Sequence, residues 1–146
     1  MRKMKNDLKL EILAEDKIPE IASLLKQLNP NLTIEVISGF LKEMFALKNY
    51  VCFALYNSDK LIGVSSGWLT IRIYSGRQLE VDNVIIDSSA QSQGFGKIFF
   101  GFIESWAKQY KCETIELNTY VQNSKSHKFY FNNGFSILGF HFQKQI

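Results

Sequence analysis

The chain has 146 residues, of which 46% are hydrophobic and 21% charged, and its formal net charge is +3. This length and composition are typical of one globular domain with a sizeable core, and they exclude a disordered or fibrous chain. Lysine and arginine are scattered among the acidic residues instead of forming a basic stripe, which argues against nucleic-acid binding but is compatible with a small anionic ligand. We therefore expect a single domain over residues 1–146.

The N-terminus and the cysteines favour a cytoplasmic protein. The opening residues, MRKMKNDLKLEIL, lack an apolar signal segment with a cleavage site, and no apolar run approaches the roughly 18 residues of a membrane span. Cys52 and Cys112 lie in or beside apolar runs and do not form a metal-binding pair. We expect them to be reduced, buried and not joined by a disulfide.

The first half of the chain predicts a strand, a pair of helices and a β-hairpin. Asp16 and Thr33 are placed to cap the two helices, and Asn29-Pro30-Asn31 ends the first of them. The apolar positions of each helix recur every three or four residues. These positions are Ile18, Ile21, Leu25 and Leu28 in the first helix and Ile34, Ile37, Leu41 and Met44 in the second, which ends near Lys48-Asn49. The predicted strands are 9–13, 50–56 and 61–73, with a turn at 57–60 between the last two.

The second half alternates strands and helices. After a turn at 75–77 we expect strands at 79–87, 114–119 and 135–142 and helices at about 97–110 and at 124–132, the latter ended by Gly134. The helix at 97–110 should bury Ile98, Phe99, Phe102, Ile103, Trp106 and Tyr110. The order βααβββαβαβ predicts an α/β fold of the mixed α+β kind. Its central sheet should be mixed but mostly antiparallel, with one parallel pair joined by a right-handed crossover and about four flanking helices.

A pair of glycines, Gly94 and Gly96, stands where the strand 79–87 should give way to a helix. Bare backbone at a helix start lets an anion approach unpaired N–H groups, although a turn glycine followed by a close-packing glycine explains the same pair. Two familiar phosphate cradles are excluded. Phe99 replaces the third glycine of a dinucleotide fingerprint, and Gln91 and Ile98 replace the first and last residues of a P-loop.

The wider window resembles the GNAT superfamily of acyl-CoA-dependent N-acetyltransferases. Gln91-Ser92-Gln93-Gly94-Phe95-Gly96 is similar to the acyl-CoA signature Q/R-x-x-G-x-G/A of that family. The stretch from Asn123 to Phe135 is similar to its N-x-x-A-x-x-F-Y-x-x-x-G-F pattern, with Ser126 in place of the alanine. The resemblance is specific from Leu79 to Phe135, and it implies the GNAT fold for the whole chain.

The resemblance also implies a binding site for acetyl-CoA as co-substrate, with no metal. Backbone groups of Val84, Ile85 and Ile86 would pair with the pantetheine arm as an added strand. The cofactor-binding loop would consist of Gln91, Ser92, Gln93, Gly94, Phe95, Gly96 and Lys97, and its N–H groups from Ser92 to Lys97 would hold the pyrophosphate. The Lys97 ammonium would either contact a phosphate or be solvated. Asn123 would hydrogen-bond the pantetheine, cap the following helix, or do both.

The reaction that the resemblance implies is attack of a primary amine of a small molecule or peptide on the thioester. Tyr130 matches the general acid of the family, a role that competes with a plain core aromatic. The oxyanion donor would be a backbone N–H near Ile85. Glu80 and Asp82 alternate on one strand and so share a face, and either one would take the amine proton through water unless both are merely solvated. Burial or a water relay is needed because a solvated carboxylate is a weak base toward an alkylamine of pKa about 10.

Other function classes have less support. His127 and His141 have no partners for a metal site, and hydrolase motifs such as G-x-S-x-G are absent from the sequence. A non-catalytic acyl-CoA sensor and an acetyltransferase acting on aminoacyl-tRNA remain compatible with the motifs. The alternation of Phe140 and Phe142 in the last predicted strand would permit a homodimer.

Overall fold

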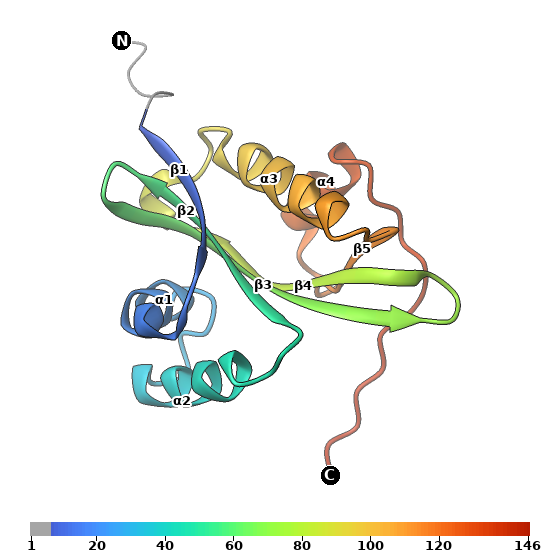
Figure 1. Cartoon of the computed structure of the whole chain (residues 1–146), viewed down its shortest axis with the longest axis horizontal. Coiled ribbons are helices and arrows are strands. Elements are labelled where there is room, and N and C mark those ends of the chain that lie inside the picture. Colours follow the sequence, from blue (N-terminus) through green and yellow to red (C-terminus); the bar gives the residue numbers. More distant parts are fainter. Residues whose placement is uncertain (1–6) are drawn as a thin grey trace. The chain divides into compact units, whose positions relative to one another are not determined.

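The computed structural model describes residues 7–146, which divide into two compact units after Glu116. The first unit holds a mixed sheet of strand order β1-β2-β3-β4-β5. Neighbouring strands are antiparallel from β1 to β4, so the parallel pair is β4 and β5, as predicted. The strands are β1 (Leu8–Leu13), β2 (Tyr50–Asn57), β3 (Lys60–Arg72), β4 (Gly76–Ile86) and β5 (Thr114–Leu117) (Figure 1).

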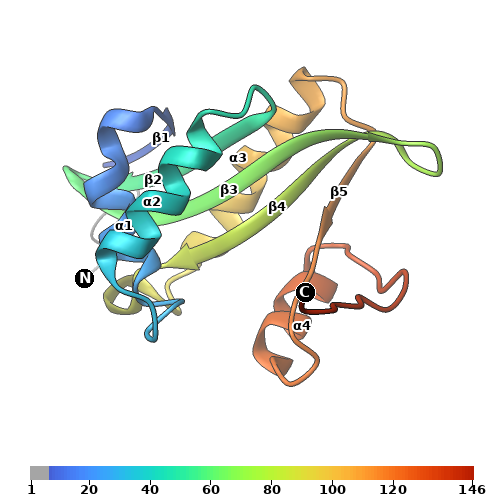
Figure 2. The same cartoon turned by 90° about the horizontal axis from the view of Figure 1, so that it is seen from below.

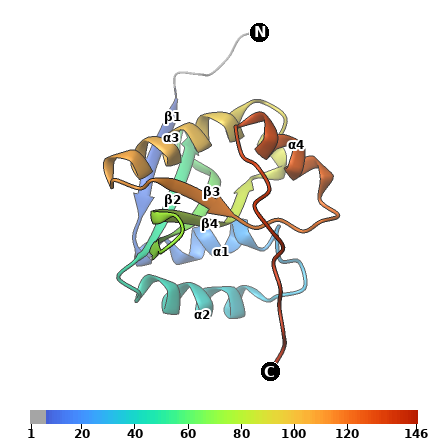
Figure 3. The same cartoon turned by 90° about the vertical axis from the view of Figure 1, so that its right-hand side faces the viewer.

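Helices cover both faces of this sheet. The helices α1 (Ile18–Leu25) and α2 (Ile34–Phe45) lie side by side on one face, and α3 (Phe95–Gln109) lies on the other (Figures 2 and 3). The alternation of side chains along β2 supplies both layers of core. Cys52, Ala54 and Tyr56 join the cluster beneath α1 and α2, whereas the Phe53 ring meets Phe102 and Trp106 of α3 edge to face.

The first helix is shorter than predicted and begins differently. A 3₁₀ turn at Glu15–Lys17 precedes it, and Asp16 does not cap it, because the N-cap position belongs to Lys17, which makes no side-chain cap hydrogen bond. Its C-terminal end is fixed by Asn29, whose amide side chain donates to the carbonyl oxygen of Leu25 at 3.1 Å. Leu28 therefore lies beyond the helix and is exposed.

The second helix begins as predicted and ends early. The Thr33 hydroxyl accepts a hydrogen bond from the Val36 N–H at 3.2 Å, which is the expected N-cap geometry. Ile37 and Leu41 are buried against the sheet, but Ile34 is exposed. The helix stops at Phe45 instead of Lys48, and β2 follows at once.

The third helix starts two residues earlier than the predicted start at Lys97, directly after Gly94. Its predicted apolar face is confirmed for Phe99 and Ile103, which are fully buried. Three more of the predicted positions, Ile98, Phe102 and Trp106, are half-buried. Tyr110 is exposed, because it is the C-cap residue, and its ring stacks on Trp106 at 4.0 Å between centroids.

The second unit contains α4 (Ser124–Asn132), whose bounds are those predicted, and Gly134 after it adopts a φ of +86°. The strand predicted at 135–142 does not form; this segment has no regular secondary structure. A strand requires a partner for its backbone groups, and none of the described strands pairs with this segment. β5 likewise ends at Leu117 instead of Thr119.

The cysteines are free thiols, and only one of them matches the expectation of burial. Cys52 is fully buried, and burial raises the pKa of its thiol to about 12, whereas Cys112 is half-buried. Among residues 7–146, no helix combines the length and apolar character needed to cross a membrane.

Candidate functional site

Hydrogen bonds and an ion pair fix the first residues of the loop between β4 and α3. The Asp87 carboxylate accepts hydrogen bonds from the N–H and hydroxyl of Ser89, at 2.9 and 2.8 Å, and thereby caps the short 3₁₀ turn at Ser88–Ala90. These bonds, with the Lys60 ammonium 3.5 Å away, hold the pKa of Asp87 below its usual range. The loop is therefore anchored to the end of the β2–β3 hairpin.

The two glutamines of the loop fold back onto backbone. The Gln91 amide donates to the carbonyl oxygen of Ile86 at 2.9 Å, and the Gln93 amide reaches the carbonyl oxygen of Ser89 at 3.5 Å. Ser92 adopts a φ of +62°, so the chain turns sharply between them. This arrangement ties both side chains to the base of the loop, so neither bonds to the N–H groups from Ser92 to Lys97.

Gly94 is the N-cap of α3 and adopts a φ of +82°, a left-handed conformation that favours glycine. A Cβ built on it would meet no atom within 4 Å, so the space over this backbone is open. In the part of the chain that the structure describes, no hydrogen bond is recorded for the N–H groups from Ser92 to Lys97, and no side chain caps the helix. The start of a 15-residue helix with unpaired donors beneath open space suits an anion such as a pyrophosphate.

Strand β4 is the second component of the site. The N–H of Glu113 donates to the carbonyl oxygen of Arg77 at 2.8 Å, which sets where β5 meets β4. Because β5 has four residues and β4 has 11, β5 cannot pair with the whole of β4. Among the described strands, the outer edge of Val84, Ile85 and Ile86 therefore has no neighbour of sufficient length. This edge can accept an extended ligand arm as an added strand.

A β-bulge interrupts β4 just before that edge. Ser66 pairs with Asp82 and Val64 with Ile85, so one residue of β3 faces two residues of β4, namely Asn83 and Val84. Asn83 adopts a φ of +51°. A bulge leaves backbone groups outside the regular ladder, which is the condition that an oxyanion donor near Ile85 requires.

The two carboxylates share one face of the sheet, as predicted. In the antiparallel register Glu80 is opposite Trp68 and Asp82 is opposite Ser66, and the same face carries Tyr50 toward α1 and α2. Glu80 is half-buried, with its carboxylate 3.8 Å from the Arg72 guanidinium. Asp82 is exposed and accepts the N–H of Asn83 at 2.8 Å.

The second unit holds the remaining predicted residues. The Asn123 side chain accepts the N–H of Ser126 at 3.3 Å, so its capping role is confirmed. Tyr130 lies on α4, half-buried, with its ring packed edge to face against Phe129 and Phe135. His127 is tied to the Tyr120 carbonyl oxygen at 2.9 Å.

Sequence reasoning missed a buried polar pair beside the bulge. The Tyr50 hydroxyl and the Ser66 hydroxyl are 2.9 Å apart, and the Asn83 amide donates to Ser66 at 3.4 Å. The sequence does contain features that indicate polar contacts here. Ser65-Ser66 places two hydroxyls in an otherwise apolar run of β3, and Asn83 lies inside a strand, where asparagine is unusual.

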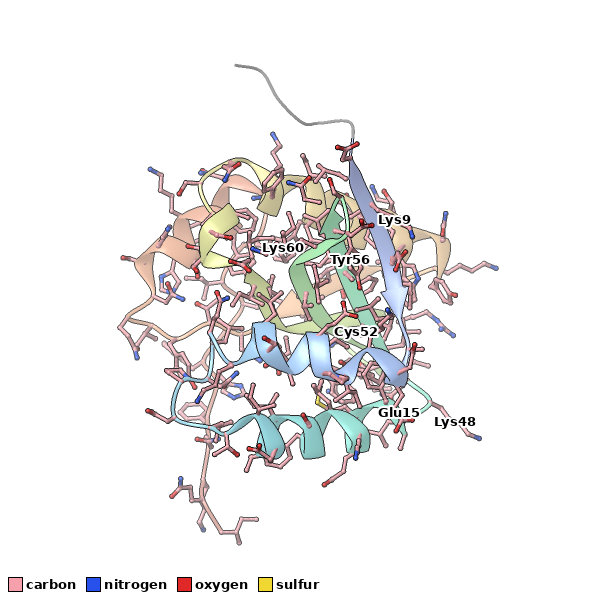
Figure 4. All side chains as sticks on the ribbon, turned by 90° about the vertical axis from the view of Figure 1, so that its left-hand side faces the viewer. Lys9, Glu15, Lys48, Cys52, Tyr56 and Lys60 are labelled. Atoms are coloured by element: carbon pink, nitrogen blue, oxygen red, sulfur yellow. The ribbon has the colours of Figure 1, made fainter. Side chains whose placement is uncertain are left out.

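A hollow of about 520 Å³ lies at the end of the hairpin, lined by α1, the β2–β3 turn and Asp87. Lys60, labelled in Figure 4, is one of its lining residues. The hollow is lined by the acidic residues Glu20, Asp59 and Asp87 together with Lys60, so its charges favour no single class of ligand. Within residues 7–146, no group of three or more His, Cys, Asp and Glu side chains is arranged to hold a metal ion.

Comparison with known proteins supplies the family. The sequence-family model described as the acetyltransferase (GNAT) family matches residues 21–135. The uncharacterized N-acetyltransferase YhdJ of Bacillus subtilis (strain 168) is 22% identical over 137 residues, which cover 93% of this chain and 96% of YhdJ.

Solved structures share the fold. Aminoglycoside N-acetyltransferase AAC(6')-Iy in complex with CoA matches this structure with a TM-score of 0.83 at 15% sequence identity, and the match covers 95% of this chain and 94% of the AAC(6')-Iy chain. The aminoglycoside acetyltransferase meta-AAC0020 from an uncultured soil metagenomic sample has a TM-score of 0.80 at 19% identity, covering 98% of this chain and 100% of its own.

Proposed function

Because this chain belongs to the acetyltransferase (GNAT) family, we propose that it transfers the acetyl group of acetyl-CoA to a primary amine of a small molecule or peptide. The observation that carries the proposal is the start of α3. There Gly94, at a φ of +82°, leaves open space over backbone donors for which the structure records no partner within the described residues. A pyrophosphate fits this environment in both charge and access.

The cofactor would be held along β4 and at the loop. The outer edge of Val84–Ile86 would pair with the amides of the pantetheine arm, and the N–H groups from Ser92 to Lys97 would bind the pyrophosphate. The exposed Lys97 ammonium would add a charge-assisted contact to a phosphate. Asn123 would complete the contacts to pantetheine while it caps α4.

The chemistry would be a direct transfer. The amine nitrogen forms a bond to the acetyl carbon, the carbon–sulfur bond breaks, and the sulfur takes a proton from the Tyr130 phenol. The proton lost by the amine passes through water to Asp82 or Glu80. Backbone N–H groups at the β4 bulge, near Ile85, would stabilise the developing oxyanion.

The character of the acceptor follows from the same face of the sheet. Asp82 is an exposed carboxylate on the face that also carries the half-buried Trp68, and Glu80, opposite Trp68, is paired with Arg72. A carboxylate and an aromatic surface on one face favour a cationic amine. The aminoglycoside acetyltransferases among the structural neighbours give amine-bearing small molecules as the first class to test.

The test is a thiol-release screen with acetyl-CoA over aminoglycosides, amino sugars, polyamines, amino acids and peptide N-termini. We expect amine-dependent release of CoA by the wild-type protein, with kcat lowered about 100-fold in Tyr130→Phe. The affinity of Tyr130→Phe for CoA should be unchanged. Binding of CoA without release for any amine would favour a non-catalytic acyl-CoA sensor instead, and full turnover by Tyr130→Phe would remove the acid role from this phenol.

A further inference from the structure

The β4 bulge contains a residue in a costly backbone conformation. Asn83 lies in the left-handed region at a φ of +51°. Asparagine tolerates this conformation better than most residues, but it remains unfavourable for every residue except glycine. The extra residue also removes regular pairing with β3 at this point. The bulge therefore needs other contacts to keep one conformation.

Those contacts come from a buried hydroxyl pair. Ser66, fully buried on β3, accepts the Asn83 amide at 3.4 Å and lies 2.9 Å from the Tyr50 hydroxyl on β2. A serine hydroxyl offers one donor and two acceptor positions, so both contacts can be made together. The pair thus links three strands across the bulge.

Packing fixes the Tyr50 hydroxyl in place. The Tyr50 ring meets Phe45 edge to face at 5.0 Å and the tilted Trp68 ring at 4.9 Å. Burial raises the pKa of this phenol, so it stays protonated through the physiological range and acts as a hydrogen-bonding group, not as a base. It is therefore a fixed point from which the bulge can be held.

We propose that the Tyr50–Ser66 pair is a positioning device, which holds the β4 bulge through Asn83 and so sets the backbone groups of Val84 and Ile85 for acyl transfer. The catalytic part of this inference rests on the proposed function. Asp82, one of the two candidate bases, immediately precedes Asn83 and receives its N–H, so the same device orients that carboxylate. Tyr50 and Ser66 act through the bulge and touch no reacting atom in this scheme.

The chain provides a matched control. Tyr56 lies on the same face of β2 as Tyr50 and is buried, whereas Tyr50 is half-buried. The Tyr56 hydroxyl donates a hydrogen bond to Glu20 at 3.3 Å, away from the bulge. Figure 4 shows Tyr56 near the β2–β3 turn, beside Lys9 of β1. Tyr50→Phe and Tyr56→Phe each remove one oxygen and keep the ring, so they differ in the position of the lost bond.

The first readout needs no substrate. In the free Tyr50→Phe variant, the amides of residues 82–86 should exchange about 3- to 10-fold faster than in the wild-type protein, and the rest of the sheet should exchange at the wild-type rate. In Tyr56→Phe, exchange at residues 82–86 should not change. In a Ser66→Ala background, Tyr50→Phe should add no further change, because the path to Asn83 is already broken. If exchange accelerated equally throughout the sheet, or did not accelerate at residues 82–86, the proposal that the Tyr50–Ser66 pair holds the bulge would be wrong.

The second readout is kinetic. With the amine found in the screen, Tyr50→Phe should lower kcat by about 3- to 10-fold and leave the KM for acetyl-CoA within about twofold, while Tyr56→Phe changes neither. Faster exchange at the bulge with an unchanged kcat would overturn the catalytic part of the inference. If no amine reacts, the proposed function fails, and the exchange experiment still decides whether the pair holds the bulge.

Discussion

Replacing Gly94 with alanine tests the anion site with one methyl group. At a φ of +82° an alanine costs roughly 1–2 kcal/mol in backbone strain, and the open space around the new Cβ means that no clash adds to this. For a chain of this size, 1 kcal/mol corresponds to a shift in Tm of about 2–4 °C. The domain should therefore stay folded while its melting temperature falls by a few degrees.

The effect on CoA binding should be much larger than this loss of stability suggests. The methyl group would occupy the space through which a phosphate approaches the N–H groups, and a hydrogen bond to a charged group contributes about 1.5–3 kcal/mol. We expect the Kd for CoA, measured by calorimetry, to rise by about 10- to 100-fold.

Gly134→Ala is the matched control for backbone strain. Gly134 has a φ of +86°, and a Cβ on it also meets no atom within 4 Å, but it follows α4 and is no part of the loop. Its variant should lose similar stability and keep the affinity for CoA. Equal loss of CoA binding in both variants, or normal binding by Gly94→Ala, would refute the assignment of the anion site.

Two further predictions concern carboxylates. Asp82→Asn and Glu80→Gln should differ in their effect on catalysis. The variant that removes the proton acceptor should lower kcat about 100-fold and flatten the acidic limb of the pH–rate profile. Full kcat in both variants would exclude both carboxylates as the base. The pKa of Asp87 is lowered in the folded state, so its contribution to stability is fully present above the ordinary value of 3.8 and is lost as the pH falls through the lower folded value. In urea unfolding, the advantage of the wild-type protein over Asp87→Asn should shrink as the pH falls below 3.8, and an advantage independent of pH would contradict the capping role.

Local signals in the sequence were sufficient where one residue determines the structure. Thr33 and Asn123 cap helices because their side chains reach N–H groups three residues ahead, a relation that depends on spacing alone. The glycine pair located the turn from strand to helix, and Gly94 adopts the positive φ that glycine favours. The helix nevertheless begins two residues before the predicted start, and Ser92 adopts a positive φ without being a glycine.

The features that were missed depend on partners distant in the sequence. The Tyr50–Ser66–Asn83 contacts join residues 16 and 17 positions apart, and no periodicity along one strand reveals them. The strand predicted at 135–142 had a suitable alternation, but pairing depends on a neighbour that the alternation does not supply. The end of α1 was displaced because Asn29 bonds back to Leu25, which overrides the apolar spacing that reaches Leu28.

The most direct measurement of the central claim is the change in backbone amide chemical shifts on titration with CoA. The account predicts that the largest changes occur at the N–H groups from Ser92 to Lys97, with smaller changes along Val84–Ile86. The contrary result would be unchanged shifts at the start of α3, or changes concentrated in the hollow beside the β2–β3 turn.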